Sequence, residues 1–195
     1  MKRLTLIIAI MVQVVTMQAA PLRVALLDTE DLTGQKPDPV TGSLQTGAIA
    51  RKGAPLIGKL ILKSGLFNMI DRRDFTTRID NYKRPDSANK PESSPALQAA
   101  RALRADAILK SAVLSLSAEN HSISQGGYNV ELKNLTIRLM LEVLDSTDGA
   151  IIAMADGTAS REFRITDSES TTLGEDGILQ LFEVAAAKAI PEIEG

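Results

Sequence analysis

The order of apolar and polar residues in the first part of the chain predicts a strand, a helix and a second strand. Apolar runs at residues 22–27 and 66–70 are typical of buried strands. Between them, over residues 43–64, apolar side chains recur at helical spacing, but Pro55 is expected to kink or break a helix there. Gly65 stands where a C-cap glycine would end that helix.

The second half of the chain reads mainly as long strands. Ser94 and Pro95 suit the N-cap and the first position of a helix over residues 95–105, and residues 106–119 predict a third strand. The alternating pattern that follows slips by one residue near Asn134, where we expect a bulge or bend. A tight turn at residues 146–149 then predicts a long antiparallel hairpin over residues 133–166.

A final helix is predicted near the C-terminus. Its apolar face is formed by Ile178, Leu181, Phe182, Ala185 and Ala189. With this helix, the chain reads as an α/β protein: a single-domain mixed β-sheet with covering helices and a long antiparallel hairpin.

The first 20 residues have the layout of a secretory signal peptide. Lys2 and Arg3 precede an apolar core that is shorter than the roughly 20 residues of a membrane-spanning helix, and small residues follow it. We expect cleavage after Ala19, so that residues 1–19 are the signal peptide and residues 20–195 form one periplasmic domain. No later segment is long and apolar enough to span a membrane as a helix.

Composition narrows the function classes. The chain has 22 basic and 24 acidic residues, and removal of Lys2 and Arg3 with the signal peptide leaves a net charge of −4. This mild acidity and the absence of tryptophan argue against a nucleic-acid surface, which needs basic patches and stacking rings. The absence of cysteine excludes disulfides and lipid attachment at an N-terminal cysteine.

Two local patterns could suggest catalysis. Residues 53–60, GAPLIGKL, almost match a phosphate-binding P-loop, but Leu60 replaces the hydroxyl that would hold magnesium, and the segment lies within a helical pattern. His121 is the single histidine and would be the base of a serine hydrolase, yet its surroundings predict an exposed hairpin turn without a nucleophile elbow. We favour the structural interpretation of both.

Acidic residues are the remaining candidates for chemistry. Asp28, Glu30 and Asp31 follow the first strand, and Glu175 with Asp176 opens the last helix. Paired carboxylates can hydrolyse glycosides, but the helix dipole already explains acids in a first turn, and the first group lacks the spacing of an EF-hand loop. The sequence therefore predicts no catalytic residue, no metal ligand and no cofactor.

Four stretches taken together resemble a known family. RVALLDTEDLTG, SGLFNMIDRRDF, ARALRADAILKSAVLSL and RLMLEVLDSTDGAIIAMADGTAS are similar, in this order, to segments of the curli-production assembly/transport (CsgG-type) family and of the related periplasmic activators of penicillin-binding proteins (LpoB-type). The resemblance covers most of residues 22–190. It implies a non-enzymatic domain on the periplasmic side of the bacterial outer membrane, which binds other envelope proteins and, in the channel branch, further copies of itself.

This resemblance sets the functional hypotheses. The leading one is a periplasmic interaction protein that binds or activates an envelope partner such as a peptidoglycan synthase. An accessory subunit of a curli-type outer-membrane secretion system is the alternative within the family, and a periplasmic hydrolase using Asp28, Glu30 or His121 is the alternative of another class. In the segment DRRDF, Asp74 is expected to cap a short helix, and Arg72 and Arg73 are the candidate partner-binding residues, at least one of them with a structural role.

Overall fold

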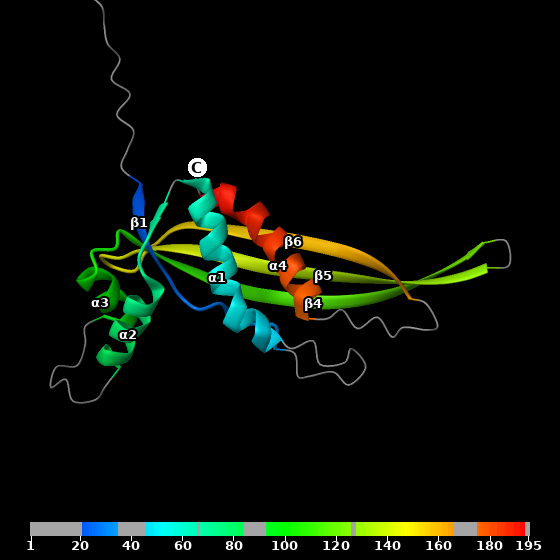
Figure 1. Cartoon of the computed structure of the whole chain (residues 1–195), viewed down its shortest axis with the longest axis horizontal. Coiled ribbons are helices and arrows are strands. Elements are labelled where there is room, and N and C mark those ends of the chain that lie inside the picture. The colour runs from blue at the N-terminus through cyan, green and yellow to red at the C-terminus, as the bar shows by residue number, and fades with distance from the viewer. Residues whose placement is uncertain are drawn as a thin grey trace, which may run out of the picture.

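The computed structural model describes residues 21–34, 46–65, 67–83, 93–125, 128–165 and 175–193 (Figure 1). Strands and helices alternate in its first half, and three long strands followed by a helix make up the second half. In chain order the elements are β1 (Leu22–Leu26), β2 (Glu30–Asp31), α1 (Thr46–Ser64), β3 (Phe67–Met69), α2 (Arg72–Tyr82), α3 (Pro95–Ala102), β4 (Ala107–Gln125), β5 (Tyr128–Asp145), β6 (Ile151–Ile165), α4 (Glu175–Ala189) and the 3-10 turn η1 (Ile190–Ile193).

The strands form one mixed sheet in the order β3-β1-β4-β5-β6, with β2 paired beside β4. β1 runs parallel to both of its neighbours, β3 and β4, whereas β5 runs antiparallel to both β4 and β6. The β4–β5 and β5–β6 hairpins are therefore consecutive and share their middle strand. This arrangement confirms the predicted mixed α/β sheet with a long antiparallel hairpin.

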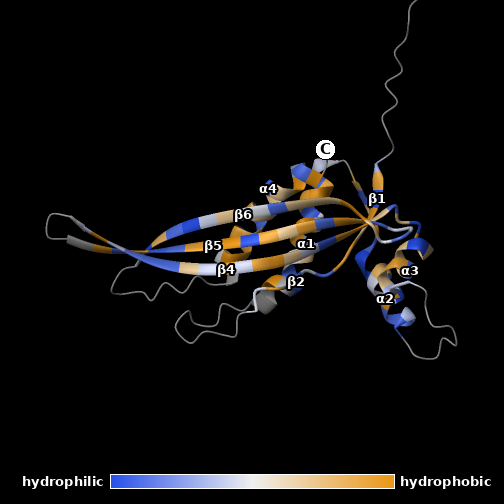
Figure 2. Cartoon of the chain, turned by 180° about the vertical axis from the view of Figure 1, so that it is seen from behind, coloured by the Kyte–Doolittle hydropathy of each residue, from blue (hydrophilic) through white to orange (hydrophobic). Residues whose placement is uncertain are grey.

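Helices cover the two faces of the sheet unequally. α1 and α4 pack on one face along the long strands, where Val24, Leu26 and the odd-numbered residues of β5 from Leu135 to Val143 are buried. α2 and α3 pack on the other face only at one end of the sheet, against Ala25 and Ile108. Seen from behind, β4–β6 extend past α2 and α3, and no helix of the described residues lies over that part of the strands (Figure 2).

Most of the predicted elements are confirmed. The apolar runs 22–27 and 66–70 contain β1 and β3, and Gly65 adopts the positive φ of 74° that a C-cap glycine supplies. Ser94 caps α3, with Pro95 as its first residue. The predicted apolar face of the last helix is buried along its whole length.

Of the kink or break predicted at Pro55, the break does not occur. α1 is a single helix of 19 residues with Pro55 in its interior. Proline there removes one backbone hydrogen bond and costs about 3 kcal/mol. Pro55 itself is exposed, while Ala54, Ile57 and Ile61 are buried against the sheet, so packing of the turns on either side offsets that cost.

Of the bulge or bend predicted near Asn134, the bulge is contradicted by the strand pairing. β4 and β5 pair without interruption there, with Asn134 opposite Glu119, and the irregularities lie between Val113 and Ser115 and between Val143 and Leu144. The apolar pattern slips because Val130 and Leu132 lie on the opposite face of the same regular ladder from the buried Leu135. α1 and α4 do not extend over that part of the hairpin (Figure 1).

The predicted turn between β5 and β6 is confirmed, with a positive φ of 81° at Gly149. The Asp145 carboxylate accepts hydrogen bonds from the Thr147 backbone N–H at 2.6 Å. This backbone bond, followed by the Thr147 side chain, holds the pKa of Asp145 below its ordinary value. A depressed folded-state pKa means that the contribution of Asp145 to stability is present above its unfolded pKa and is lost as the pH falls through the folded value.

Candidate functional site

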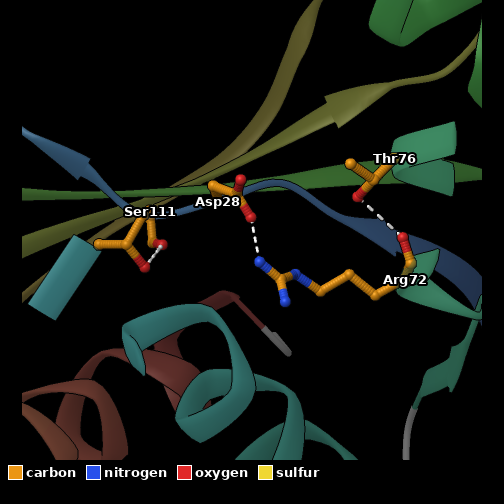
Figure 3. Close-up of polar contacts among 5 residues, drawn as sticks. Asp28, Arg72, Thr76 and Ser111 are labelled. Carbon is orange, nitrogen blue, oxygen red and sulfur yellow. Dashed lines mark hydrogen bonds and ion pairs between the residues drawn. The ribbon is translucent and has the colours of Figure 1, made fainter. Parts of the chain in front are cut away.

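The first candidate site lies at the carboxyl end of β1, where open α/β sheets commonly bind ligands. The chain leaves β1 through Asp28, and α2 starts immediately after the neighbouring strand β3, so Asp28 and Arg72 meet although 44 residues separate them. The Arg72 guanidinium donates to the Asp28 carboxylate (Figure 3). The structure thus brings together one of the predicted acids and one of the predicted arginines.

Arg72 and Arg73 differ in their surroundings. The side chain of Arg72 is 39% exposed, and its Nε is a buried nitrogen without a hydrogen-bond partner within the described part of the chain. Its backbone carbonyl accepts from the Thr76 hydroxyl at 2.9 Å (Figure 3). Arg73, one residue further along α2, is exposed. Arg72 therefore joins α2 to the end of β1, whereas Arg73 faces solvent.

The helix that follows β3 begins earlier than predicted. Asp71 is its N-cap: one carboxylate oxygen accepts from the backbone N–H of Arg73 at 2.7 Å and of Asp74 at 3.2 Å. Asp74, expected to be the cap, lies in the first turn. The four charged residues DRRD hence form a cap and a first helical turn, because Asp71 is the first acid after the strand with free N–H groups within reach.

Replacing Asp71 by alanine is expected to lower the free energy of unfolding by about 1 kcal/mol, because two backbone N–H groups of α2 lose their acceptor. The matched control is Asp74→Ala, which removes an acid from the same turn without removing the cap and should cost less. Chemical denaturation of both variants measures the difference. A larger loss for Asp74→Ala would show that the cap lies at position 74 instead.

A cavity of about 440 Å³ lies beside the Asp28–Arg72 contact. It has an apolar floor from β1 and α2 and acidic groups at its rim, with Lys83 and Asp80 3.5 Å apart. Behind it, the buried hydroxyls of Thr29 and Ser111 are hydrogen bonded at 2.9 Å (Figure 3). The lining residues are Leu26, Leu27, Asp28, Thr29, Glu30, Phe75, Thr76, Ile79, Asp80 and Lys83.

The other predicted acids are also engaged in contacts. Glu30 lies 4.0 Å from Lys110, whose Nζ is 3.4 Å from Glu142, and Asp31 accepts hydrogen bonds from Thr33. Glu175 and Asp176 open α4 as predicted. Across the described ranges, no group of three or more His, Cys, Asp or Glu side chains is placed to hold a metal ion.

His121 lies far from these acids. It belongs to β4 rather than to a turn, is exposed, pairs opposite Leu132, and has its Nε2 3.6 Å from Glu119. The backbone N–H of Leu27, next to Asp28, donates a hydrogen bond to the carbonyl of Leu109, which lies on β4 as His121 does. Twelve residues of β-strand separate positions 109 and 121, which corresponds to about 40 Å. Asp28 and His121 are therefore not brought together. The P-loop-like residues 53–60 lie inside α1 and form no loop.

The sequence analysis missed a second candidate site, which we call the open sheet face. It consists of the side chains of β4–β6 that point away from α1 and α4, on the side of the sheet that faces the viewer in Figure 2. Arg138 and Asp156 form an ion pair at 2.5 Å, and the Thr136 and Ser160 hydroxyls are bonded at 2.8 Å. Across the strands its rows are Lys110–Glu142–Met154, Ala112–Met140–Asp156, Ser115–Arg138–Thr158 and Ser117–Thr136–Ser160.

One end of the open sheet face is apolar. Met154 is 52% exposed, and the adjoining Ile151 and Ile152 at the start of β6 are 54% and 55% exposed. The signal for this site was present in the sequence as alternation over residues 153–160 of β6, where small residues face the helices and larger or polar ones face outward. No helix in the described part of the chain is both long and apolar enough to cross a membrane.

Comparison with known proteins identifies the fold. No protein-family model and no curated protein sequence matches the chain. Among solved structures, the hypothetical protein CT253 from Chlamydia trachomatis is 14% identical, with 90% of this chain and 97% of that chain covered and a TM-score of 0.51. This similarity shows a shared fold.

Two further matches have lower TM-scores. A PelC dodecamer from Paraburkholderia phytofirmans is 14% identical over 90% of each chain, with a TM-score of 0.49. The LpoB C-terminal domain from Salmonella enterica is 13% identical, over 71% of this chain and 82% of that chain, with a TM-score of 0.45.

Proposed function

We propose that this chain is a non-enzymatic protein of the bacterial cell envelope that acts by binding another envelope protein. The observation that carries the proposal is the open sheet face: beyond α2 and α3, no helix of the described part of the chain covers this side of the three long strands, and the face includes exposed Ile152 and Met154. Such a flat surface with a polar centre and an apolar end suits a protein partner better than a small molecule, which requires a concave site.

The kind of partner follows from the sequence. Residues 1–19 have the layout of an export signal, and the four family-like stretches resemble periplasmic activators of penicillin-binding proteins. A cell-wall synthase is therefore the first partner to test, and an outer-membrane secretion component is the alternative within the family. The proposed location is the periplasm.

Of the two arginines, Arg73 is the proposed partner contact, because it is exposed on α2, whereas Arg72 is held by Asp28. Arg73→Ala should weaken partner binding with little effect on stability, and Arg72→Ala should act mainly through the packing of α2 on β1.

A hydrolase is less consistent with the geometry. The acid Asp28 pairs with Arg72, and the single histidine lies about 40 Å further along β4. The chemistry of a triad needs hydrogen-bond distance between base and acid. An activity of the wild-type protein on cell-wall polymers that disappears in the triple variant D28A/E30A/H121A would overturn the binding proposal.

The decisive experiment is site-specific photocrosslinking in the native envelope. A photoreactive residue at Thr158, on the open sheet face, should capture one defined envelope protein. The matched control is the same residue at Lys63, which is exposed on α1 on the opposite side of the sheet. Equal capture from both positions, or from neither, would count against the open sheet face as the binding surface.

A further inference from the structure

A groove of about 470 Å³ lies between α1 and α4, on the side of these helices that faces away from the sheet. The two helices lie side by side across the same face of the sheet (Figure 1). Apolar side chains of Pro55, Leu56 and Leu179 are among the residues that line the groove. Beyond it, Leu62 on α1 is 60% exposed and Val184 on α4 is 50% exposed. This layer thus carries apolar surface that is unusual for a solvated helix pair.

The two helices carry opposite charge. The sequence of α1, TGAIARKGAPLIGKLILKS, contains four basic residues and no acid. The sequence of α4, EDGILQLFEVAAAKA, contains three acids and a single lysine, which lies in the last turn. At the groove itself, Arg51 and Lys52 lie on one wall, and Asp176 and Glu183 lie on the other. One wall is therefore basic and the other acidic.

The charges of the two walls also lie at matching positions along the helix axes. Both helices run in the same direction across the sheet (Figure 1), and Lys59 Nζ is 3.5 Å from Glu183 Oε1. Arg51 and Lys52 precede Lys59 on α1 by about the same number of residues as Asp176 precedes Glu183 on α4. Arg51, Lys52 and Asp176 all line the groove, so the charges of the two helices are in register.

We propose that this groove is a homodimer interface in which a second copy of the chain packs by a two-fold axis along the groove. Rotation about this axis places each α1 over the α4 of the other copy. Each residue keeps its position along the axis, because the axis is parallel to the helices. Arg51 and Lys52 then face Asp176 of the other copy, and Lys59 faces Glu183 of the other copy. The apolar residues of the two grooves meet in the middle, which gives the apolar centre and charged rim of a protein interface.

The charge pattern selects this arrangement among the alternatives. A two-fold axis across the groove would place α1 over α1 and bring two sets of four bases together, which is unfavourable. With the axis along the groove, every basic wall meets an acidic one, and the contact is the same in both directions, as an isologous interface requires.

The interface is small. A helix of 15 residues is about 22 Å long, and two helices are about 20 Å wide, so each copy contributes roughly 450 Å². This lies at the weak end of specific protein contacts. We therefore expect a weak dimer whose population rises with protein concentration.

Sedimentation velocity over a range of concentrations tests the proposal with two charge reversals. R51E/K52E makes the α1 wall acidic, and D176K/Q180K makes the α4 wall basic; each protein alone should become monomeric, with at least a tenfold weaker self-association. An equimolar mixture of the two should form the dimer again, because both contacts regain opposite charges. A misfolded variant could not be rescued in this way.

The control is R73E/R78E, which reverses two exposed charges on α2 and should leave the dimer unchanged. Monomers at every concentration of the wild-type protein would overturn the proposal, as would a dimer that survives either reversal. A monomeric wild type whose groove variants lose capture of an envelope protein would also overturn it, and would instead assign the groove to a helix of that protein.

Discussion

Replacing Gly157 with alanine is expected to lower the free energy of unfolding by about 3 kcal/mol, which is at the upper end for overpacking of a core. Gly157 lies in β6 directly beneath α4. A Cβ there would overlap the backbone carbonyl oxygen of Ala185, lie 2.8 Å from its carbon and 3.2 Å from the Ala189 Cβ. These are main-chain and short side-chain atoms that cannot rotate away, so α4 must move as a whole.

Gly58→Ala is the matched control. Its Cβ would lie 3.5 Å from Leu26 Cδ2, an ordinary contact, and alanine favours a helix interior by about 0.5–1 kcal/mol over glycine. Urea denaturation should therefore show opposite signs for the two glycine-to-alanine changes. A Gly157→Ala protein as stable as the wild type would mean that α4 does not lie this close to β6.

The elements of the fold were predictable where a local pattern determines them. The apolar spacing in α4 predicted the face that Phe182 and Ala185 bury, because an amphipathic helix must place that face on a core. Ser94 and Pro95 predicted the start of α3 for an equally local reason. Pro55 does not break α1, because the packing of the neighbouring turns on the sheet outweighs one lost hydrogen bond. That packing involves distant segments and cannot be inferred from the residues around Pro55.

The candidate sites were less predictable, since they depend on contacts between distant segments. Nothing near Asp28 in the sequence specifies Arg72 as its partner, because the contact arises from the parallel pairing of β1 with β3. The open sheet face depends on which side of β4–β6 the helices cover. The alternation in β6 predicts that one side is buried, but it does not predict how far the described helices α2 and α3 extend over the other side.

Phe182→Ala is the second change with a large expected effect, a loss of about 3–5 kcal/mol in the free energy of unfolding. The Phe182 side chain is fully buried, and its ring lies where α4 meets α1 above the sheet. A Cβ on Gly53 of α1 would lie 3.0 Å from the ring and 2.7 Å from the Thr29 hydroxyl. The ring therefore packs tightly against α1. Alanine would therefore leave a cavity that the backbone cannot close.

A control and a double variant make this prediction specific. Val184→Ala, two residues along α4 and half exposed, should change stability by less than about 0.5 kcal/mol when measured at low protein concentration. Gly53→Ala should destabilise the wild type but cost less in the Phe182→Ala background, because the truncated ring no longer opposes the new methyl group while Thr29 still does. The two changes should hence be non-additive, as expected for residues in contact. Strict additivity in urea denaturation would mean that the ring of Phe182 does not fill the space above Gly53.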